Sequence, residues 1–208
     1  MPSVRHFGNR TNGPVTEPSS FAKLVSLAAH DLRTPLATVS GFAKTLTRTG
    51  ELEDPAARYV QMIEMASAQM VELLDELGLA ARIEAGRYQP NLLEADTLEL
   101  ARATAEALGE DRVRAGGVGG GVRVDLEATQ RAVSALAQCA LRHGGVEVVD
   151  MTAAGPELTI APITPASAPV VLGEDARDLG AAVAVRLVRA LGGSVELDGE
   201  TLHVRLPE

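Results

Sequence analysis

Apolar residues recur every three or four positions through residues 19–48, and the same spacing returns in a second segment that ends near Ala85. This period predicts two amphipathic α-helices. The segment between them is short, and Gly86 follows the second helix, so the two helices are expected to pair as an antiparallel hairpin. The apolar stripes consist of Phe21, Leu24, Val25, Ala28, Leu32, Leu36, Val39, Phe42, Ala43 and Leu46 in the first helix, and of Tyr59, Met62, Ile63, Ala66, Met70, Leu73, Leu74, Leu77 and Ala81 in the second.

Both stripes are too long for a single hairpin to bury. Two copies of the hairpin can bury them in a four-helix bundle, which predicts a homodimer. On a helical projection His30 lies about 180° from the middle of the first stripe. We therefore expect His30 to be exposed and not to belong to the core.

The pattern changes after Pro90 and indicates a mixture of helices and strands. Helices are expected at about 95–108, 126–143 and 175–191, and strands at VEVVDM, at ELTIAPI and on both sides of the DG turn near the C-terminus. GGVGGG at 116–121 lacks the Lys-Ser/Thr of a phosphate-binding loop and is predicted to be a flexible loop, as is the Pro-rich segment 164–169. The fold class is α+β, with a disordered tail at 1–18, the helical hairpin at 19–88 and an α/β domain at 89–208.

Charge and composition narrow the functional classes. The chain of 208 residues has a net charge of -9, which argues against nucleic acid as a partner because phosphate binding needs clustered basic residues. Cys139 is the single cysteine, so no internal disulfide is expected, and this suits a reducing cytoplasm. No apolar run approaches the roughly 18 residues of a membrane span. We expect a cytoplasmic protein without a membrane segment.

The residues around His30 suggest a chemical role. Asp31 is its neighbour, and Thr34 lies one turn further along, close to the same face. Pro35 follows in the middle of the helix, where it removes a backbone hydrogen bond at a cost of about 3 kcal/mol. A cost of that size suggests a functional reason for the local shape of the helix.

The same part of the helix offers small and basic residues to a partner. The small ones leave the imidazole accessible, and the basic ones suit a protein with an acidic site. We therefore expect partner binding through Arg33, Ala37, Gly41, Lys44 and Arg48.

HDLRTPLATVSGFAKTL, which begins at His30, resembles the H-box of two-component sensor histidine kinases, with seven consecutive positions in agreement. LLDELGLAARIEAGRYQP is similar to the end of the second dimerisation helix of that family. The resemblance implies that His30 accepts a phosphoryl group on a ring nitrogen, as a histidine nucleophile can. It also implies that Asp31 orients the ring or accepts its proton, and that Thr34 positions a water that dephosphorylates the partner regulator.

The resemblance further implies a C-terminal domain of the ATPase family shared with gyrase and Hsp90, but the nucleotide boxes are altered. The Mg²⁺-binding Asn of the family aligns with Cys139 and an earlier Asn with Ala135, and a thiol is a poor ligand for Mg²⁺. Asp178 stands at a glycine position of the phosphate loop, where a carboxylate would repel a triphosphate. The segment from Thr164 to Arg177 is short for an ATP lid. We expect a degenerate ATPase-like α/β sandwich that binds no cofactor and holds no metal, with Cys139 buried and His143 placed to suit the end of its helix.

These observations favour a histidine phosphotransferase that shuttles phosphate between receiver-domain aspartates of response regulators through His30. Mg²⁺ would come from the acidic site of the receiver. Two alternatives remain open. One is a divergent ATP-dependent histidine kinase, and the other is a non-enzymatic dimeric scaffold or a phosphatase-type regulator of a response regulator.

Overall fold

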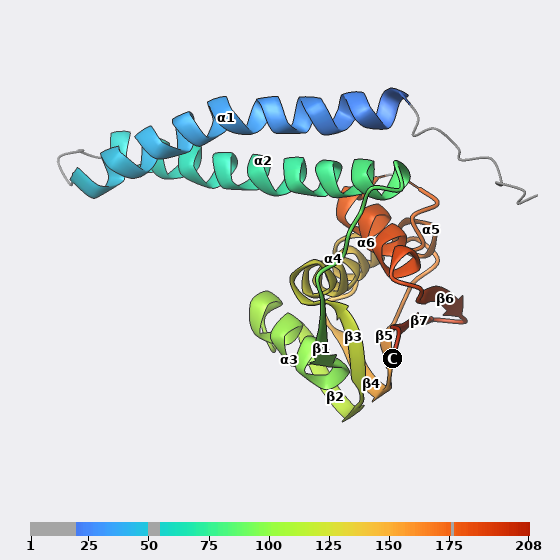
Figure 1. The fold of residues 1–208 in the computed structure, drawn as a ribbon. Helices are drawn as coiled ribbons and strands as arrows, with labels where there is room; N and C mark the ends of the chain where they lie inside the picture. The colour runs from blue at the N-terminus through green and yellow to red at the C-terminus, as the bar shows by residue number, and fades with distance from the viewer. Residues whose placement is uncertain (1–19, 50–54, 176) are drawn as a thin grey trace, which may run out of the picture.

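In the computed structural model, residues 20–49, 55–175 and 177–208 are described, so the predicted tail at 1–18 lies outside the described residues. Helices α1 (Ser20–Thr49) and α2 (Ala56–Glu84) run antiparallel as a long hairpin beside a compact α/β unit (Figure 1). This confirms the predicted hairpin. Within the described ranges, no helix has the length and apolarity that crossing a membrane requires.

Buried residues with heptad spacing, most of them small, hold the hairpin together. Among the α1 residues whose side chains the structure describes, the buried positions are seven residues apart: Ala22, Ala29, Leu36 and Ala43. Opposite them on α2, Val60, Ser67 and Ala81 are buried at multiples of the same interval. Seven residues correspond to about two helical turns, so these residues form one narrow contact line along each helix.

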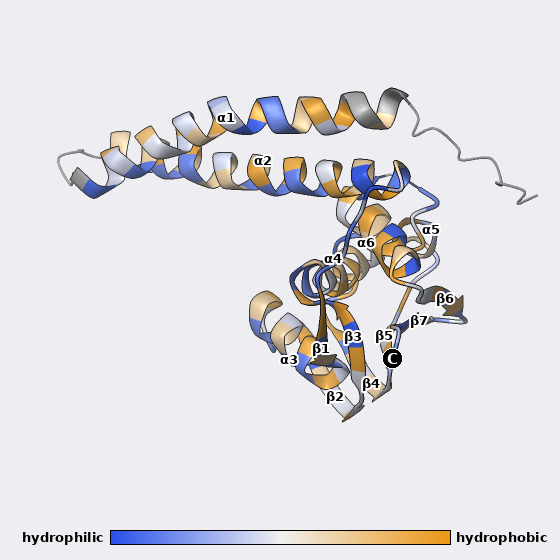
Figure 2. Cartoon of the chain, in the orientation of Figure 1, coloured by the Kyte–Doolittle hydropathy of each residue, from blue (hydrophilic) through white to orange (hydrophobic). Residues whose placement is uncertain are grey.

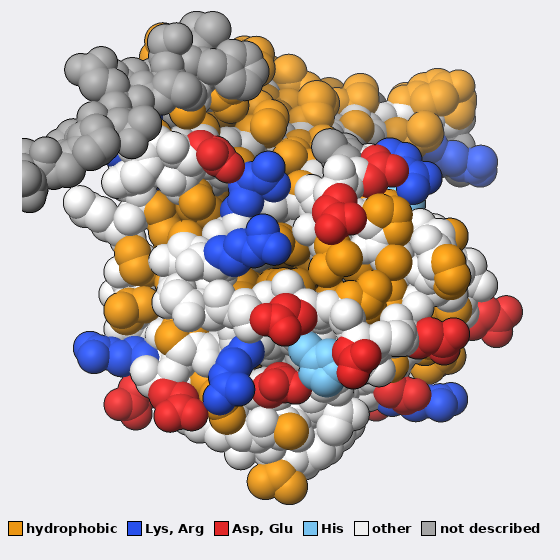
Figure 3. Space-filling view, turned by 90° about the vertical axis from the view of Figure 1, so that its right-hand side faces the viewer, with side chains coloured by type: hydrophobic (Ala, Val, Ile, Leu, Met, Phe, Trp, Pro, Cys, Tyr) orange, Lys and Arg blue, Asp and Glu red, His pale blue; other side chains and the backbone are white. Residues whose placement is uncertain are grey.

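Most large side chains of the two predicted stripes remain outside this contact line. Phe42 is 68% exposed and Met62 65% exposed. Figure 2 shows hydrophobic residues along both helices, and Figure 3 shows hydrophobic side chains gathered over the hairpin at the top of the molecule. One chain therefore leaves most of the two predicted stripes exposed, while Ala22 and Ala29, which were not assigned to the stripe, help to close the hairpin. We name the exposed large side chains of the stripes the outer apolar face: Leu32, Val39, Phe42, Leu46, Tyr59, Met62, Ile63, Met70, Leu73 and Leu77.

The α/β unit is built on a five-stranded mixed sheet. Along β4, Val149, Met151 and Ala153 are buried while the residues between them are exposed, so one face of the sheet packs against the helices. Only the β2–β4 pair is parallel among the described strands. The strand order is β2 (Val113–Gly119), β4 (Val149–Gly155), β5 (Glu157–Ala161), β7 (Thr201–Arg205) and β6 (Ser194–Asp198), and the helices are α3 (Thr97–Leu108), α4 (Leu126–Gly144) and α6 (Leu179–Ala190).

The glycine-rich segment is the largest error of the sequence-based prediction. It forms strand β2 and the start of β3 (Gly121–Asp125), and β3 pairs with β1 (Leu92–Asp96), which was not predicted. Gly117 has φ of 98° and lies opposite Ala153 of β4. The glycines of this segment thus allow two strands to approach closely, and they do not form the flexible loop that was predicted. The predicted loop at 164–169 also ends in a short helix, α5 (Ala168–Val171).

The hairpin is anchored to the α/β unit through the end of α2. Leu79 is buried in the core of the unit, and Ile83 packs against that core. Glu84 accepts a hydrogen bond of 2.9 Å from Arg186 of α6. The His30 segment of α1 and helices α4 and α6 therefore lie on opposite sides of α2, as Figure 1 shows.

Candidate functional site

His30 lies on the exposed surface of α1, as its position outside the apolar stripe predicted. Asp31 and Thr34 are exposed as well. Among the described residues, no hydrogen bond joins the His30 ring to Asp31 or Thr34. The imidazole is therefore open to an incoming reactant from solvent.

A basic recess adjoins His30 and was not predicted. It has a volume of about 360 Å³, and Gly78 and Arg82 of α2 form its far wall together with Arg87. Arg33 completes the guanidinium groups on its lining. Three guanidinium groups beside one imidazole favour a phosphoryl group or an acidic surface at this place. Gly78 and Arg82 are four residues apart and therefore share one face of α2, where the glycine leaves space beside the guanidinium. Nothing in the local sequence indicates that this face lies opposite His30.

Arg33, which was predicted to contact a partner protein, makes an ion pair within the hairpin. Its guanidinium donates a hydrogen bond to the carboxylate of Asp75 on α2, and both side chains are part-exposed. Arg33 therefore links α1 to α2 beside His30. The other predicted contact residues, Ala37, Gly41, Lys44 and Arg48, are exposed.

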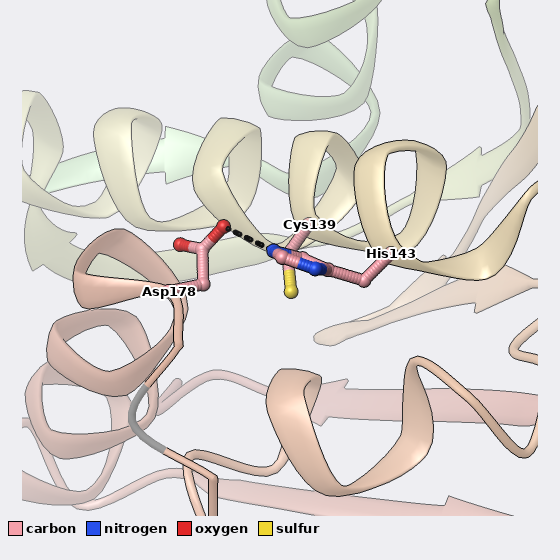
Figure 4. Close-up of side chains that lie close together, drawn as sticks. All are labelled: Cys139, His143 and Asp178. Carbon is pink, nitrogen blue, oxygen red and sulfur yellow. Dashed lines mark hydrogen bonds and ion pairs between the residues drawn. The ribbon is translucent and has the colours of Figure 1, made fainter.

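A second cluster lies between α4 and α6, at the positions where the ATPase resemblance fails. Asp178 caps α6, where its Oδ1 accepts a hydrogen bond of 3.1 Å from the backbone N–H of Ala181. Its Oδ2 lies 3.1 Å from the Arg142 guanidinium and 3.2 Å from Nε2 of His143. Cys139 is fully buried, as expected, and lies beside this pair (Figure 4). His143 thus pairs with Asp178 and does not merely close the end of its helix.

Burial and negative charge shift two pKa values around Asp178. Burial, reinforced by the charge of Asp178, raises the pKa of the Cys139 thiol to about 12. The carboxyl group of Glu76 on α2 has a raised pKa, mainly because it is partly buried. The negative charges of Asp178 and, to a smaller extent, Glu72 raise this pKa further. The junction of α2, α4 and α6 therefore brings the carboxylates of Glu76 and Asp178 close together, and Arg142 partly compensates their charge.

Replacing Glu76 by Gln is expected to stabilise the protein at neutral pH. The folded state raises the pKa of Glu76 above 4.5, so the protonated form favours folding and this contribution is lost as the pH rises through the folded-state value. The melting temperature of Glu76→Gln should exceed that of the wild type at pH 7, and the difference should shrink below pH 4.5. Glu106→Gln, at an exposed position of α3 and not among the groups that shift the pKa of Glu76, is the control for loss of one carboxylate. An equal gain at both pH values would contradict the expectation.

The comparisons with known proteins agree with this architecture. The model of the His Kinase A (phospho-acceptor) domain matches residues 22–86. The probable sensor histidine kinase TcrY of Mycobacterium tuberculosis is 28% identical over 91 residues, which are 44% of this chain and 18% of the relative. A sensor-like histidine kinase of Rhizobium meliloti, R01002, is 31% identical over 156 residues, which are 67% of this chain and 30% of the relative. The chain thus spans less than a third of the length of either relative.

Solved structures show the same fold. Full-length ShkA, crystallised with AMPPNP, superposes with a TM-score of 0.65 at 20% identity and covers 91% of this chain, while this chain covers 45% of ShkA. The histidine kinase AdeS of Acinetobacter baumannii gives a TM-score of 0.51 at 15% identity over 86% of this chain and 97% of AdeS. The helical hairpin and the mixed sheet therefore have the architecture of the phospho-acceptor and ATPase-like parts of histidine kinases. Residues 22–86 belong to the His Kinase A (phospho-acceptor) domain family, and the chain is similar to two-component sensor histidine kinases.

Proposed function

We propose that this chain is a histidine phosphotransferase of a two-component phosphorelay. The observation that carries the proposal is the exposed His30 beside the recess with Arg33, Arg82 and Arg87. A ring nitrogen of His30 attacks the phosphorus of an aspartyl phosphate on a receiver domain, and the bond from phosphorus to the aspartate oxygen breaks. Phosphohistidine and a free carboxylate result, and the reverse step passes the phosphoryl group to a second receiver.

The recess supports transfer in either direction. Guanidinium groups near the histidine balance the charge of the phosphoryl group while it moves between nitrogen and oxygen. Exposed Ala37, Gly41, Lys44 and Arg48 continue the surface along α1, where a receiver with an acidic site would dock. That acidic site would supply the Mg²⁺ for the reaction.

The second domain supports a donor other than ATP. Cys139 and Asp178 stand where the family resemblance places a Mg²⁺-binding amide and a phosphate-loop glycine, and neither favours a magnesium triphosphate. The segment that corresponds to the lid is folded inward: Val170 and Val171 of α5 are fully buried. Thr164 fastens that segment to the end of α4 by donating a hydrogen bond of 3.2 Å to the Gly144 carbonyl. We therefore propose little or no ATP binding.

The outer apolar face supports a homodimer. It runs along both helices of the hairpin, and a second hairpin would bury it in a four-helix bundle. The exposed His30 lies outside this face, so dimerisation leaves it accessible. We propose that the dimer acts in the cytoplasm.

The test of the function offers the purified chain two phosphoryl donors in parallel. One reaction contains radiolabelled ATP with Mg²⁺, and the other contains a prephosphorylated receiver domain. We expect label on the chain from the receiver and none from ATP. Label taken directly from ATP would make the chain a divergent histidine kinase, and no label from any receiver of a panel would favour the scaffold or phosphatase-type regulator.

A further inference from the structure

Three side chains that phosphotransfer at His30 does not use meet between α4 and α6. Cys139 and His143 are four residues apart on one face of α4, and Asp178 opens α6. The thiol sulfur, an imidazole nitrogen and a carboxylate oxygen all lie within 4.8 Å of one another. Figure 4 shows the three side chains converging on one small volume.

We propose that Cys139, His143 and Asp178 bind one transition-metal ion of the Zn²⁺ class and thereby fasten α4 to α6. With metal–ligand bonds of about 2.0–2.3 Å, the donors of a tetrahedral site lie roughly 3.5 Å apart. Nε2 of His143 is already 3.2 Å from Oδ2 of Asp178. The site therefore needs only a modest side-chain movement, in which the metal replaces that hydrogen bond.

The donors select the kind of metal. A thiolate with an imidazole suits Zn²⁺ and similar ions, whereas Mg²⁺ requires oxygen ligands. The proposed site thus differs in chemistry from the Mg²⁺ site that the family resemblance would place near Cys139. Three protein ligands leave a fourth position for water or another ligand.

The other groups around the site are compatible with a cation. Oδ1 of Asp178 caps α6 and leaves Oδ2 as the ligand atom. Arg142 also contacts Oδ2, but its side chain is 56% exposed and can turn into solvent. Glu76 adds a second carboxylate near Asp178. Arg177 is a cation near the thiol, but its guanidinium is paired with Asp175 at 2.7 Å and its side chain is 59% exposed, so it can stay in solvent.

The burial of the ligands suits a stable site with a route of entry. The side chain of His143 is 19% exposed and that of Asp178 is 7% exposed, so the ion would enter past the imidazole. Cys139 is fully buried beneath them. Coordination requires the thiolate, so the thiol proton is released to solvent as the metal binds.

The test titrates the metal-free full-length chain with Co²⁺, which reports its ligands by absorption, and then with Zn²⁺. We expect one ion per chain, a sulfur-to-cobalt charge-transfer band, and loss of that band when Zn²⁺ displaces Co²⁺. Cys139→Ala, His143→Gln and Asp178→Asn should each weaken binding by at least about tenfold. Asp178→Asn is the key variant because asparagine also caps a helix N-terminus, so the start of α6 is preserved.

The matched control is His203→Gln, because His203 also contacts a carboxylate, that of Glu157 at 2.7 Å, but is not part of the Cys139 cluster. Its binding should equal that of the wild type. The proposal is overturned if the wild type binds no more tightly than His143→Gln, or if the charge-transfer band persists in Cys139→Ala. Circular dichroism checks the fold, and should Cys139→Ala fail to fold, unchanged binding in Asp178→Asn overturns the proposal equally.

Discussion

Gly117→Ala is expected to destabilise the α/β domain by about 3 kcal/mol or more, through backbone strain combined with overpacking. Gly117 has φ of 98°, a region that residues with a side chain rarely adopt. A Cβ atom at this position would lie 2.1 Å from the carbonyl oxygen and 2.8 Å from the amide nitrogen of Ala153. The contact is with backbone of the adjacent strand, so the strands β2 and β4 would have to separate. Urea unfolding followed by circular dichroism measures the loss.

Gly116→Ala provides the matched control for Gly117→Ala. It lies in the same strand, a Cβ there would meet nothing within 4 Å, and its φ is not in the left-handed region. Its unfolding midpoint should stay close to that of the wild type. Equal losses of stability in the two variants would contradict the prediction, because they would show that the close approach to Ala153 is not the cause of the loss.

The glycine run also shows where prediction from the sequence stops. Strand β2 lacks the alternation of apolar and polar residues that identifies a strand, and only Val113 and Val118 among its residues are β-branched. It is held by its parallel pairing with β4, whose Val149 is 36 positions after Val113 in the register. A contact between segments so far apart leaves no local signal. The helices, in contrast, were predictable because their period is local.

The hairpin gives an intermediate case. The period of apolar positions predicts both helices, yet it does not distinguish the residues that close the hairpin from those left outside. Ala29 and Ala43 are buried while Phe42 is largely exposed, because small residues allow the two helices to approach closely. Residue size, and not hydrophobicity alone, determines which side of the stripe faces α2.

The candidate sites divide in the same way. His30 could be found because its motif is continuous in the sequence. Arg82 and Arg87 could not, since only the pairing of α1 with α2 brings them to the recess at His30. Cys139 and His143 share one face of a helix and could have been noticed, but Asp178 joins them only through the packing of α6 on α4.

His30→Gln is expected to reduce labelling of the chain by a phosphorylated receiver at least about a thousandfold, because removal of a nucleophile abolishes the covalent step. Glutamine keeps a polar side chain but has no nucleophilic ring nitrogen. The exposed position means that stability should change by no more than about 0.5 kcal/mol. Single-turnover transfer from a radiolabelled receiver, with a thermal melt of the same preparation, measures both quantities.

Variants at the neighbouring positions separate the roles within the motif. Asp31→Asn should slow phosphoryl transfer without abolishing it, because the carboxylate would orient the ring or accept its proton while His30 remains the nucleophile. Thr34→Ala should leave transfer to His30 largely intact and slow the loss of phosphate from the receiver, since the hydroxyl would position the attacking water. Persistent label on His30→Gln would place the phosphoryl group on another residue and refute the assignment. Equal slowing of transfer and of dephosphorylation by Thr34→Ala would argue that Thr34 shapes the docking surface instead of positioning water.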